Sequence, residues 1–234
     1  MIRKINEERY EKVLSALKEA CINEEVISLA LKMEINLVKL FDEKIINANK
    51  RNIKNNIEVV SKNLLGIYGN YIATNYYKGL GYNVFNEYDV CDKKGKLVTK
   101  ADIYFVDKNG KQNYCEVKTT PQIIDNIRNY VDDNNLLKGS YVDKDNEILK
   151  YKNIGKKLLK QVEKLSSNNG VVNVIVFNGC YIDDIILNSL KEKNVVIRKL
   201  AVSIEELEKT VMQTVYRVLQ VYSELKSENK KLAK

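Results

Sequence analysis

The sequence contains no histidine, a single proline and only four scattered cysteines. Without histidine the chain lacks the usual general base and the commonest transition-metal ligand, so any catalysis must rely on carboxylates, lysine, hydroxyls or a hard cation. Cys21, Cys91, Cys115 and Cys180 form no CxxC pair, which leaves zinc sites and disulfide frameworks unsupported. We expect these cysteines to be reduced and to be mostly packing residues.

Long hydrophobic runs are also missing. The sequence has no stretch of about 18 apolar residues, and its start, MIRKINEERY, lacks a hydrophobic signal core. The sequence therefore predicts neither membrane insertion nor secretion. The expected location is cytoplasmic. Hydrophobic residues at 44% and charged residues at 30% are typical of a soluble globular protein. The 234 residues are enough for one medium domain with attached helices or two small domains.

The chain is basic, with a formal net charge of +8. This charge fits a polyanionic partner, because lysines that neutralise phosphates gain affinity by releasing counterions. A bias towards lysine, asparagine and isoleucine can also reflect the nucleotide composition of a genome. The charge alone therefore leaves both interpretations open.

The N-terminal part of the chain has a helical pattern. Apolar residues recur at helical spacing from about residue 5 to 55, and a further helix is predicted over about 56–78. Gly79 and Gly81 are expected to end that helix, after which an extended segment begins.

The remainder reads as an α/β region. Residues from about 82 to 118 alternate like strands, with turns at DKKGK and DKNGK. The polar segment 121–151 is predicted to be an irregular insertion with a short helix. A helix over about 153–166, the strand VVNVIVFNG, a helix over about 183–193 and the strand VVIRKLAV follow. This order indicates an α/β core.

The last predicted helix, about 203–229, carries apolar residues seven positions apart at Ile204, Val211, Val218 and Leu225. Such a stripe fits either a coiled-coil seam or packing against the N-terminal helices, and packing is the favoured interpretation. The sequence thus divides into a helical N-terminal region (1–60), a core (61–201) and a C-terminal amphipathic helix (202–234).

The stretch TKADIYFVDKNGKQNYCEVKTT predicts a hairpin whose register decides which residues share a face. A two-residue turn would mix apolar and charged side chains on each face. A three-residue loop, Lys108-Asn109-Gly110, with glycine in the left-handed position places Ile103 opposite Cys115 and Asp102 opposite Glu116. The second register is favoured, because it keeps the apolar side chains on one side of the sheet.

In that register Asp102 and Glu116 face each other, with Lys118 two residues further along the same face. Two carboxylates about 5 Å apart repel each other unless a cation lies between them. The two acids and a main-chain carbonyl suit Mg²⁺, with Mn²⁺ as a substitute. Lys118 is then placed to orient or deprotonate a water, or to stabilise charge on a phosphate.

Asp102, a 13-residue gap and Glu116-Val117-Lys118 resemble the D…(D/E)xK signature of the PD-(D/E)xK, or restriction-endonuclease-like, nuclease superfamily. GNYIATNYYKGLGYNVF is similar to the helix and strand that precede the site in Holliday-junction-resolvase-like members. The resemblance spans about residues 66–120. It implies a mixed sheet flanked by helices, here with helical extensions at both ends, and metal-dependent phosphodiester hydrolysis.

The resemblance implies that Asp102 and Glu116 bind metal. It also implies that these two acids and Lys118 are the catalytic residues. Asn70 stands where such relatives usually carry a glutamate that helps to hold metal. An amide brings no charge, so the number of metals, one or two, stays open. Because cutting both DNA strands usually takes two sites, a homodimer through the terminal helices is the expected assembly.

A lysine stripe adds a candidate DNA contact. In YKNIGKKLLKQVEKL, Lys156, Lys157, Lys160 and Lys164 fall on one side of the predicted helix. They form either an ordinary solvated face or a track for a phosphate backbone.

The favoured function is a DNA endonuclease in restriction, defence or DNA processing. The alternatives are a toxin domain neutralised by an immunity protein and a catalytically silent DNA-binding module.

Overall fold

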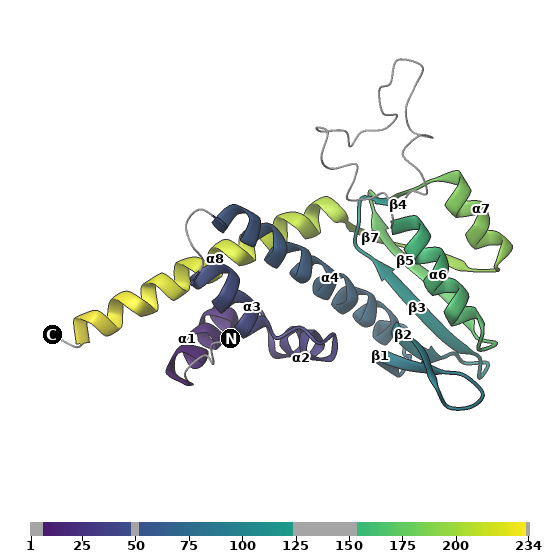
Figure 1. Cartoon of the computed structure of the whole chain (residues 1–234), viewed down its shortest axis with the longest axis horizontal. Coiled ribbons are helices and arrows are strands. Elements are labelled where there is room, and N and C mark those ends of the chain that lie inside the picture. Colours follow the sequence, from purple (N-terminus) through teal and green to yellow (C-terminus); the bar gives the residue numbers. More distant parts are fainter. Residues whose placement is uncertain (1–6, 48–51, 124–153, 233–234) are drawn as a thin grey trace, which may run out of the picture. The chain divides into compact units, whose positions relative to one another are not determined.

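The computed structural model describes residues 7–47, 52–123 and 154–232. The chain forms two compact units, drawn in Figure 1. A helical unit contains residues 1–71 and 205–234, and a sheet unit contains residues 72–204. The division by sequence placed boundaries after residues 60 and 201. The structure places them inside one long helix and at the start of the last helix.

The helical unit contains α1 (Glu7–Glu19), α2 (Glu24–Lys32), α3 (Leu37–Phe41), a π-helix η1 (Asp42–Ile46), the first part of α4 (Ile53–Gly79) and almost all of α8 (Ile204–Leu232). Asparagine caps begin two of the helices. The side chain of Asn23 accepts a hydrogen bond from the Val26 N–H, and that of Asn36 accepts one from the Lys39 N–H. Within the described residues, the segment that the sequence predicted to be helical forms helices.

The apolar stripe of α8 is buried within the helical unit. Val211, Val215 and Val218 are at most 1% exposed and belong to one cluster with residues of α1 to α4, among them Leu17 and Phe41. The prediction that this helix packs against the N-terminal helices is confirmed. The stripe is therefore occupied inside the chain, and it offers no coiled-coil seam for the expected homodimer.

The sheet unit is built on a five-stranded mixed sheet with the order β1-β2-β3-β5-β7. Its strands are β1 (Val84–Cys91), β2 (Leu97–Val106), β3 (Gln112–Lys118), β5 (Val171–Asn178) and β7 (Val196–Ser203). The first three are antiparallel, whereas β5 pairs in parallel with β3 and β7. The predicted α/β class, with a mixed sheet and flanking helices, is confirmed.

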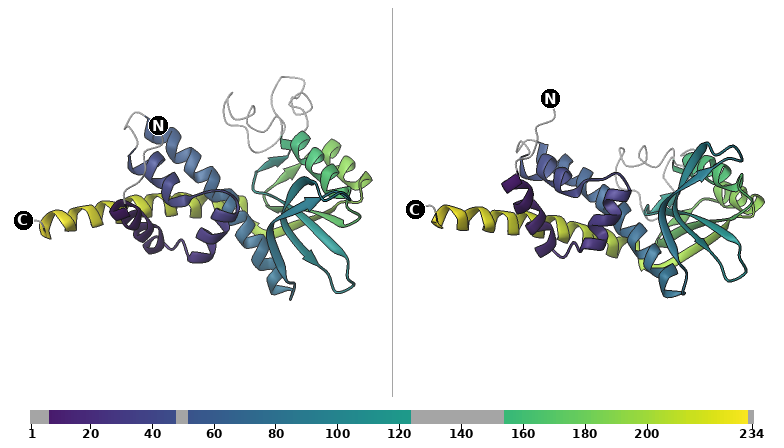
Figure 2. Two further views of the ribbon diagram at one scale, coloured as in Figure 1. Left: turned by 60° about the horizontal axis from the view of Figure 1, so that its bottom comes forward. Right: turned by 90° about the horizontal axis from the view of Figure 1, so that it is seen from below.

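Helices cover both faces of this sheet. Figures 1 and 2 show α6 (Ile154–Ser166) and α7 (Asp184–Glu192) on one face and the end of α4, from residue 72, on the other. A separate parallel pair joins β4 (Gln122–Ile123) to β6 (Tyr181–Ile182). The predicted insertion at 121–151 lies almost entirely outside the described residues.

The sheet face against α4 is apolar. Ile103, Phe105, Cys115 and Val117 are all buried there, and the Tyr77 ring of α4 lies 4.5 Å from the Phe105 ring. Burial of these side chains fixes the register, since a one-residue slip would turn all of them to the opposite face.

The β2–β3 hairpin has the predicted three-residue loop. Gly110 has φ +76°, a left-handed conformation that glycine adopts without a steric penalty. Asp107 closes the loop, because its carboxylate accepts hydrogen bonds at 2.9 Å from the N–H groups of Asn109 and Lys111. The observed pairs run from Ile103–Cys115 to Val106–Gln112. The predicted register is confirmed.

All four cysteines are free. Cys115 and Cys180 are buried, as expected of packing residues, whereas Cys21 and Cys91 are exposed. The expectation of packing was therefore wrong for these two.

Among the described residues no helix is both long enough and apolar enough to cross a bilayer.

Candidate active site

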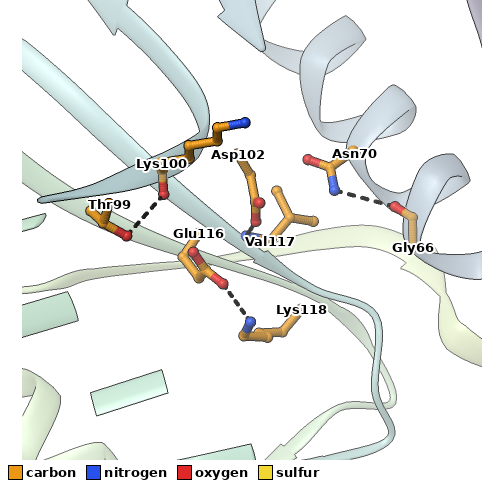
Figure 3. A network of polar contacts seen from close by, with 8 residues as sticks. All are labelled: Gly66, Asn70, Thr99, Lys100, Asp102, Glu116, Val117 and Lys118. Carbon is orange, nitrogen blue, oxygen red and sulfur yellow. Dashed lines mark hydrogen bonds and ion pairs between the residues drawn. The ribbon is translucent and has the colours of Figure 1, made fainter. Parts of the chain in front are cut away.

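The candidate site lies where β2 and β3 stop pairing through their main chains. The last main-chain pair is Ile103–Cys115, and continuing that register places Asp102 opposite Glu116. Here the Asp102 carboxylate replaces a main-chain acceptor: its Oδ2 accepts a 2.7 Å hydrogen bond from the Val117 N–H (Figure 3). The side chain of Asp102 is thereby held at the point where the strands separate.

Glu116 is a buried carboxylate with one satisfied oxygen. The residue is 2% exposed, and Oε1 accepts a hydrogen bond from the Lys118 ammonium. Its second oxygen, Oε2, is buried and has no hydrogen-bond partner within the described part of the chain. A buried carboxylate oxygen without a donor or cation is costly. This oxygen is therefore the atom of the site best suited to accept a ligand.

Lys118 completes the group of three. Its side chain is 23% exposed and pairs with Glu116, as Figure 3 shows. Glu116 and Lys118 lie two residues apart on β3, so their side chains leave the strand on the same face. The structure thus brings together all three residues that the hairpin register predicted.

The electrostatics of the two acids reflect this crowding. Burial raises the pKa of Glu116 to about 8, and the Asp102 carboxylate adds to the rise, while Lys118 opposes it. Burial also raises the pKa of Asp102, against the Val117 hydrogen bond and the Lys118 charge, which lower it. A nearby cation would favour the ionised form of both acids.

The pKa of Lys118 is raised as well, and for a base this favours the charged form. Burial lowers the pKa of its ammonium, but the charge of Glu116, its hydrogen bond and the charge of Asp102 together raise that pKa above the ordinary value. The charged form of Lys118 is therefore favoured while both carboxylates are ionised. This suits a lysine that stabilises negative charge better than one that removes a proton.

A third acid from β1 was missed by the sequence analysis. Continuing the β1–β2 register places Glu87 opposite Asp102, and its carboxylate is a further cause of the raised pKa of Glu116. Glu87 has φ +52° in the middle of a strand. Its place could not be counted back from the DKKGK turn, because the pairing shifts by one residue between Val90 and Cys91.

Asn86 fixes the main chain beside the site. Its amide donates a 2.6 Å hydrogen bond to the Thr74 hydroxyl on α4 and a longer one, 3.5 Å, to the Asp102 carbonyl oxygen. One side chain on β1 thus ties the end of α4 to the segment of β2 that carries Asp102. Neither Asn86 nor Thr74 carried a sequence signal, since isolated polar residues of this kind are common.

Asn70 belongs to the residues grouped with the helical unit. Its amide donates to the Gly66 carbonyl oxygen at 3.2 Å, one turn earlier in α4. Its own oxygen, Oδ1, is buried and has no hydrogen-bond partner within the described residues. An acceptor is thus present at this position, without the negative charge of a glutamate.

The lysine stripe is solvent-exposed as predicted. Lys156, Lys157, Lys160 and Lys164 are exposed, whereas Leu158, Val162 and Leu165 on the other side of α6 are buried. The helix packs on β2, β3 and β5. The four lysines therefore form a basic surface on the sheet unit rather than a part of its core.

The two hairpin acids fit a hard divalent cation. They offer only oxygen atoms, and Glu116 Oε2 has an unfilled acceptor position. Across residues 7–47, 52–123 and 154–232, no three or more His, Cys, Asp or Glu side chains are grouped so as to hold a metal. Mg²⁺ suits a site with two carboxylates, because it usually keeps several waters.

Comparison of the chain with known protein families, with curated proteins and with solved structures gave no match. The chemistry of the site must therefore be argued from its own geometry. That geometry joins the buried Glu116, the half-buried Asp102, a charged lysine and an unfilled carboxylate oxygen at the place where the pairing of β2 and β3 ends.

Proposed function

We propose that this protein is a Mg²⁺-dependent DNA endonuclease with a restriction-endonuclease-like core. The observation that carries the proposal is the buried Glu116 carboxylate, which has one oxygen bound to Lys118 and the other without a partner. Asp102, held by the Val117 N–H, lies in the next position of the same register. Such a group is unfavourable by itself and becomes favourable when a cation joins the acids.

Asp102 and Glu116 would hold the cation, with Mn²⁺ as a substitute for Mg²⁺. When bound, the ion would polarise the scissile phosphate and lower the pKa of a water molecule. The main-chain bond from Val117 keeps Asp102 oriented without using its second oxygen. Glu116 is fixed by burial and by the Lys118 pair. Both ligands are therefore positioned before substrate binds.

Lys118 is assigned to the phosphate. Its raised pKa keeps the ammonium charged at neutral pH, so it can donate to a phosphate oxygen as negative charge develops there. Water supplies the nucleophile: its oxygen bonds to phosphorus and it releases a proton to solvent, the bond to one sugar oxygen breaks, and the departing oxygen takes up a proton from solvent. No further reactant is required.

DNA is the proposed substrate because of the charge of the chain. The net charge is +8, and four exposed lysines follow one another along α6. Lysines that contact phosphates contribute a binding energy that does not depend on base sequence. The basic surface thus supports binding to a nucleic-acid backbone, and the acids on the same unit support its hydrolysis.

A catalytically silent DNA-binding module is the second candidate. It is favoured by the uncharged amide at Asn70 and by the Glu116–Lys118 ion pair, which already neutralises one acid. In that case the basic surface would bind DNA and the acids would only shape the sheet. Cleavage assays separate the two functions directly.

The test is cleavage of supercoiled and linear DNA, branched DNA, single strands and RNA by the purified full chain, with Mg²⁺ and with EDTA. We expect Mg²⁺-dependent cutting of DNA that is lost in Glu116→Ala and in Lys118→Ala. Glu192→Ala and Lys193→Ala change exposed residues and serve as matched controls. Cleavage that survives both site substitutions would refute the assignment. Binding without cleavage in any condition would select the silent module.

A further inference from the structure

Four aromatic rings form a continuous cluster across β1, β2 and β3. Tyr88 lies almost parallel on Tyr104, with ring centroids 4.0 Å apart and planes inclined by 13°. Phe85 lies 6.1 Å from Tyr104, and Tyr114 lies 5.4 Å from the same ring. Offset and tilted pairs at these separations stabilise one another beyond their burial.

The cluster begins beside the candidate active site. Tyr104 follows Asp102 by two residues on β2, and Tyr114 precedes Glu116 by two residues on β3. Residues two apart on a strand share a face and are separated by about 7 Å. Tyr104 and Tyr114 therefore occupy the next positions on the sheet face that carries the two acids, and the Tyr88 ring lies against both of them.

The inner rings are fixed and the outer rings are accessible. Tyr104 and Tyr114 are 7% and 5% exposed, and the Tyr114 hydroxyl donates to the Gln112 side-chain oxygen at 2.9 Å. Phe85 and Tyr88, on the edge strand β1, are 48% and 36% exposed. The buried pair thus supports two aromatic side chains that solvent can reach.

Positive charge lies beyond the rings. Strand β1 begins with Val84 opposite Phe105, next to the turn that joins β2 to β3. That turn carries the exposed residues Lys108 and Lys111. Along the β2–β3 hairpin towards its turn, the two acids therefore come first, the aromatic rings next and the ammonium groups of Lys108 and Lys111 last.

We propose that Tyr88, which stacks on Tyr104, is a stacking platform for an unpaired nucleobase next to the scissile phosphate, with Phe85 as the second exposed ring of the cluster. This inference rests on the proposed nuclease function. A single strand presents a ring, then a phosphate, at each nucleotide. A base would cover the free part of Tyr88 while an adjoining phosphate lies at the acids and another near Lys108 or Lys111. Bases within a duplex are already stacked on their neighbours and cannot cover Tyr88 in this way.

The platform makes the substrate class more specific. It favours DNA with unpaired nucleotides, such as single strands, flaps or branched ends, over fully paired duplex. Aromatic stacking tolerates every base, so it predicts a structural preference without a sequence preference.

The experiment measures binding by the full chain of a short labelled single strand and of the same strand in a blunt duplex. Ca²⁺ replaces Mg²⁺ so that binding is read without cleavage. Tyr88→Ala should weaken single-strand binding by about fivefold to 150-fold, the effect of losing one base–aromatic stack. Tyr88→Phe keeps the ring and should bind within about twofold of the unchanged chain, since stacking needs only the π-face.

Tyr216→Ala removes a tyrosine of α8 that is 56% exposed and is the matched control, expected to leave binding unchanged. Phe85→Ala, with its smaller expected loss, gives a second variant if Tyr88→Ala does not fold. A fluorescent purine analogue in the single strand should lose emission on binding to the unchanged chain and keep it with Tyr88→Ala.

Equal losses in Tyr88→Ala and Tyr216→Ala would overturn the platform, and so would equal losses for single strand and duplex. A dimer that Tyr88→Ala dissociates without affecting DNA binding would also overturn it, because β1 would then join two copies of the chain. The two proposals fail separately. Cleavage that is indifferent to Tyr88 removes the platform alone, whereas Tyr88-dependent binding without Mg²⁺-dependent cleavage removes the nuclease assignment alone.

Discussion

Replacing Glu116 by glutamine should remove much of the pH dependence of stability of the sheet unit. The pKa of Glu116 is raised from its ordinary value of 4.5 to about 8 by burial and by Asp102. A carboxyl group with a raised pKa in the folded state binds its proton more tightly there than in the unfolded chain. The folded chain therefore loses stability as the pH rises from about 5 to about 8.

The size of the effect follows from the two pKa values. Their difference corresponds to a destabilisation of about 5 kcal/mol at most, at about 1.36 kcal/mol per pKa unit. In Glu116→Gln this contribution vanishes, and the remaining decline comes from Asp102, whose pKa is raised in the same direction. Lys118 contributes no slope in this range, because a raised lysine pKa matters only at higher pH.

The assay is urea unfolding followed by circular dichroism, in EDTA, at several pH values between about 5 and 8. The matched control is Glu163→Gln, which changes an exposed glutamate of α6. We expect the free energy of unfolding to fall more steeply with pH in the unchanged chain and in the control than in Glu116→Gln. Equal slopes in all three proteins would refute the account of Glu116 as a carboxylate destabilised by its surroundings.

Two further predictions concern the rest of the sheet unit. The first replaces the four exposed lysines of α6 by alanine: Lys156, Lys157, Lys160 and Lys164. The slope of log K for DNA binding against log salt concentration should become less steep by up to about 4, since each phosphate contact contributes nearly one to that slope. An unchanged slope in a binding titration would exclude these lysines as phosphate contacts. Gly170→Ala should lower the free energy of unfolding by about 1–3 kcal/mol, because an added Cβ would overlap the Tyr114 ring and lie 3.0 Å from the Gln112 carbonyl oxygen. If urea unfolding gave the same free energy of unfolding for Gly170→Ala and for the unchanged chain, this account of the close packing at Gly170 would be contradicted.

The hairpin register could be predicted because two independent signals agree. Gly110 permits the left-handed position of a three-residue loop, and only that register places Ile103, Phe105, Cys115 and Val117 together against the core. Helix positions were also predictable from apolar spacing: α6 begins at Ile154 and ends at Ser166, against a predicted range of about 153–166.

Other features depended on contacts that the sequence does not encode locally. Glu87 joins the site through an irregular strand pairing, and Asn86 acts through a single hydrogen bond to Thr74. The boundary between the two units falls inside α4, which continues as one helix through Gly66 and Gly69 and across the boundary after Tyr71. Periodicity reports that a helix exists but does not report which core each of its turns joins.

The hydrogen bond from Val117 to Asp102 means that this acid has two roles that can be tested separately. It accepts a main-chain hydrogen bond, and it carries a negative charge. An alanine at position 102 would delete a charge and also leave a strand amide without its acceptor, so inactivity of such a variant would have two explanations. Asparagine retains an oxygen that can receive the same amide hydrogen while it removes the anion. Comparing the Asp102→Asn and Asp102→Ala variants therefore separates the structural role of the hydrogen bond from the role of the negative charge in binding a cation.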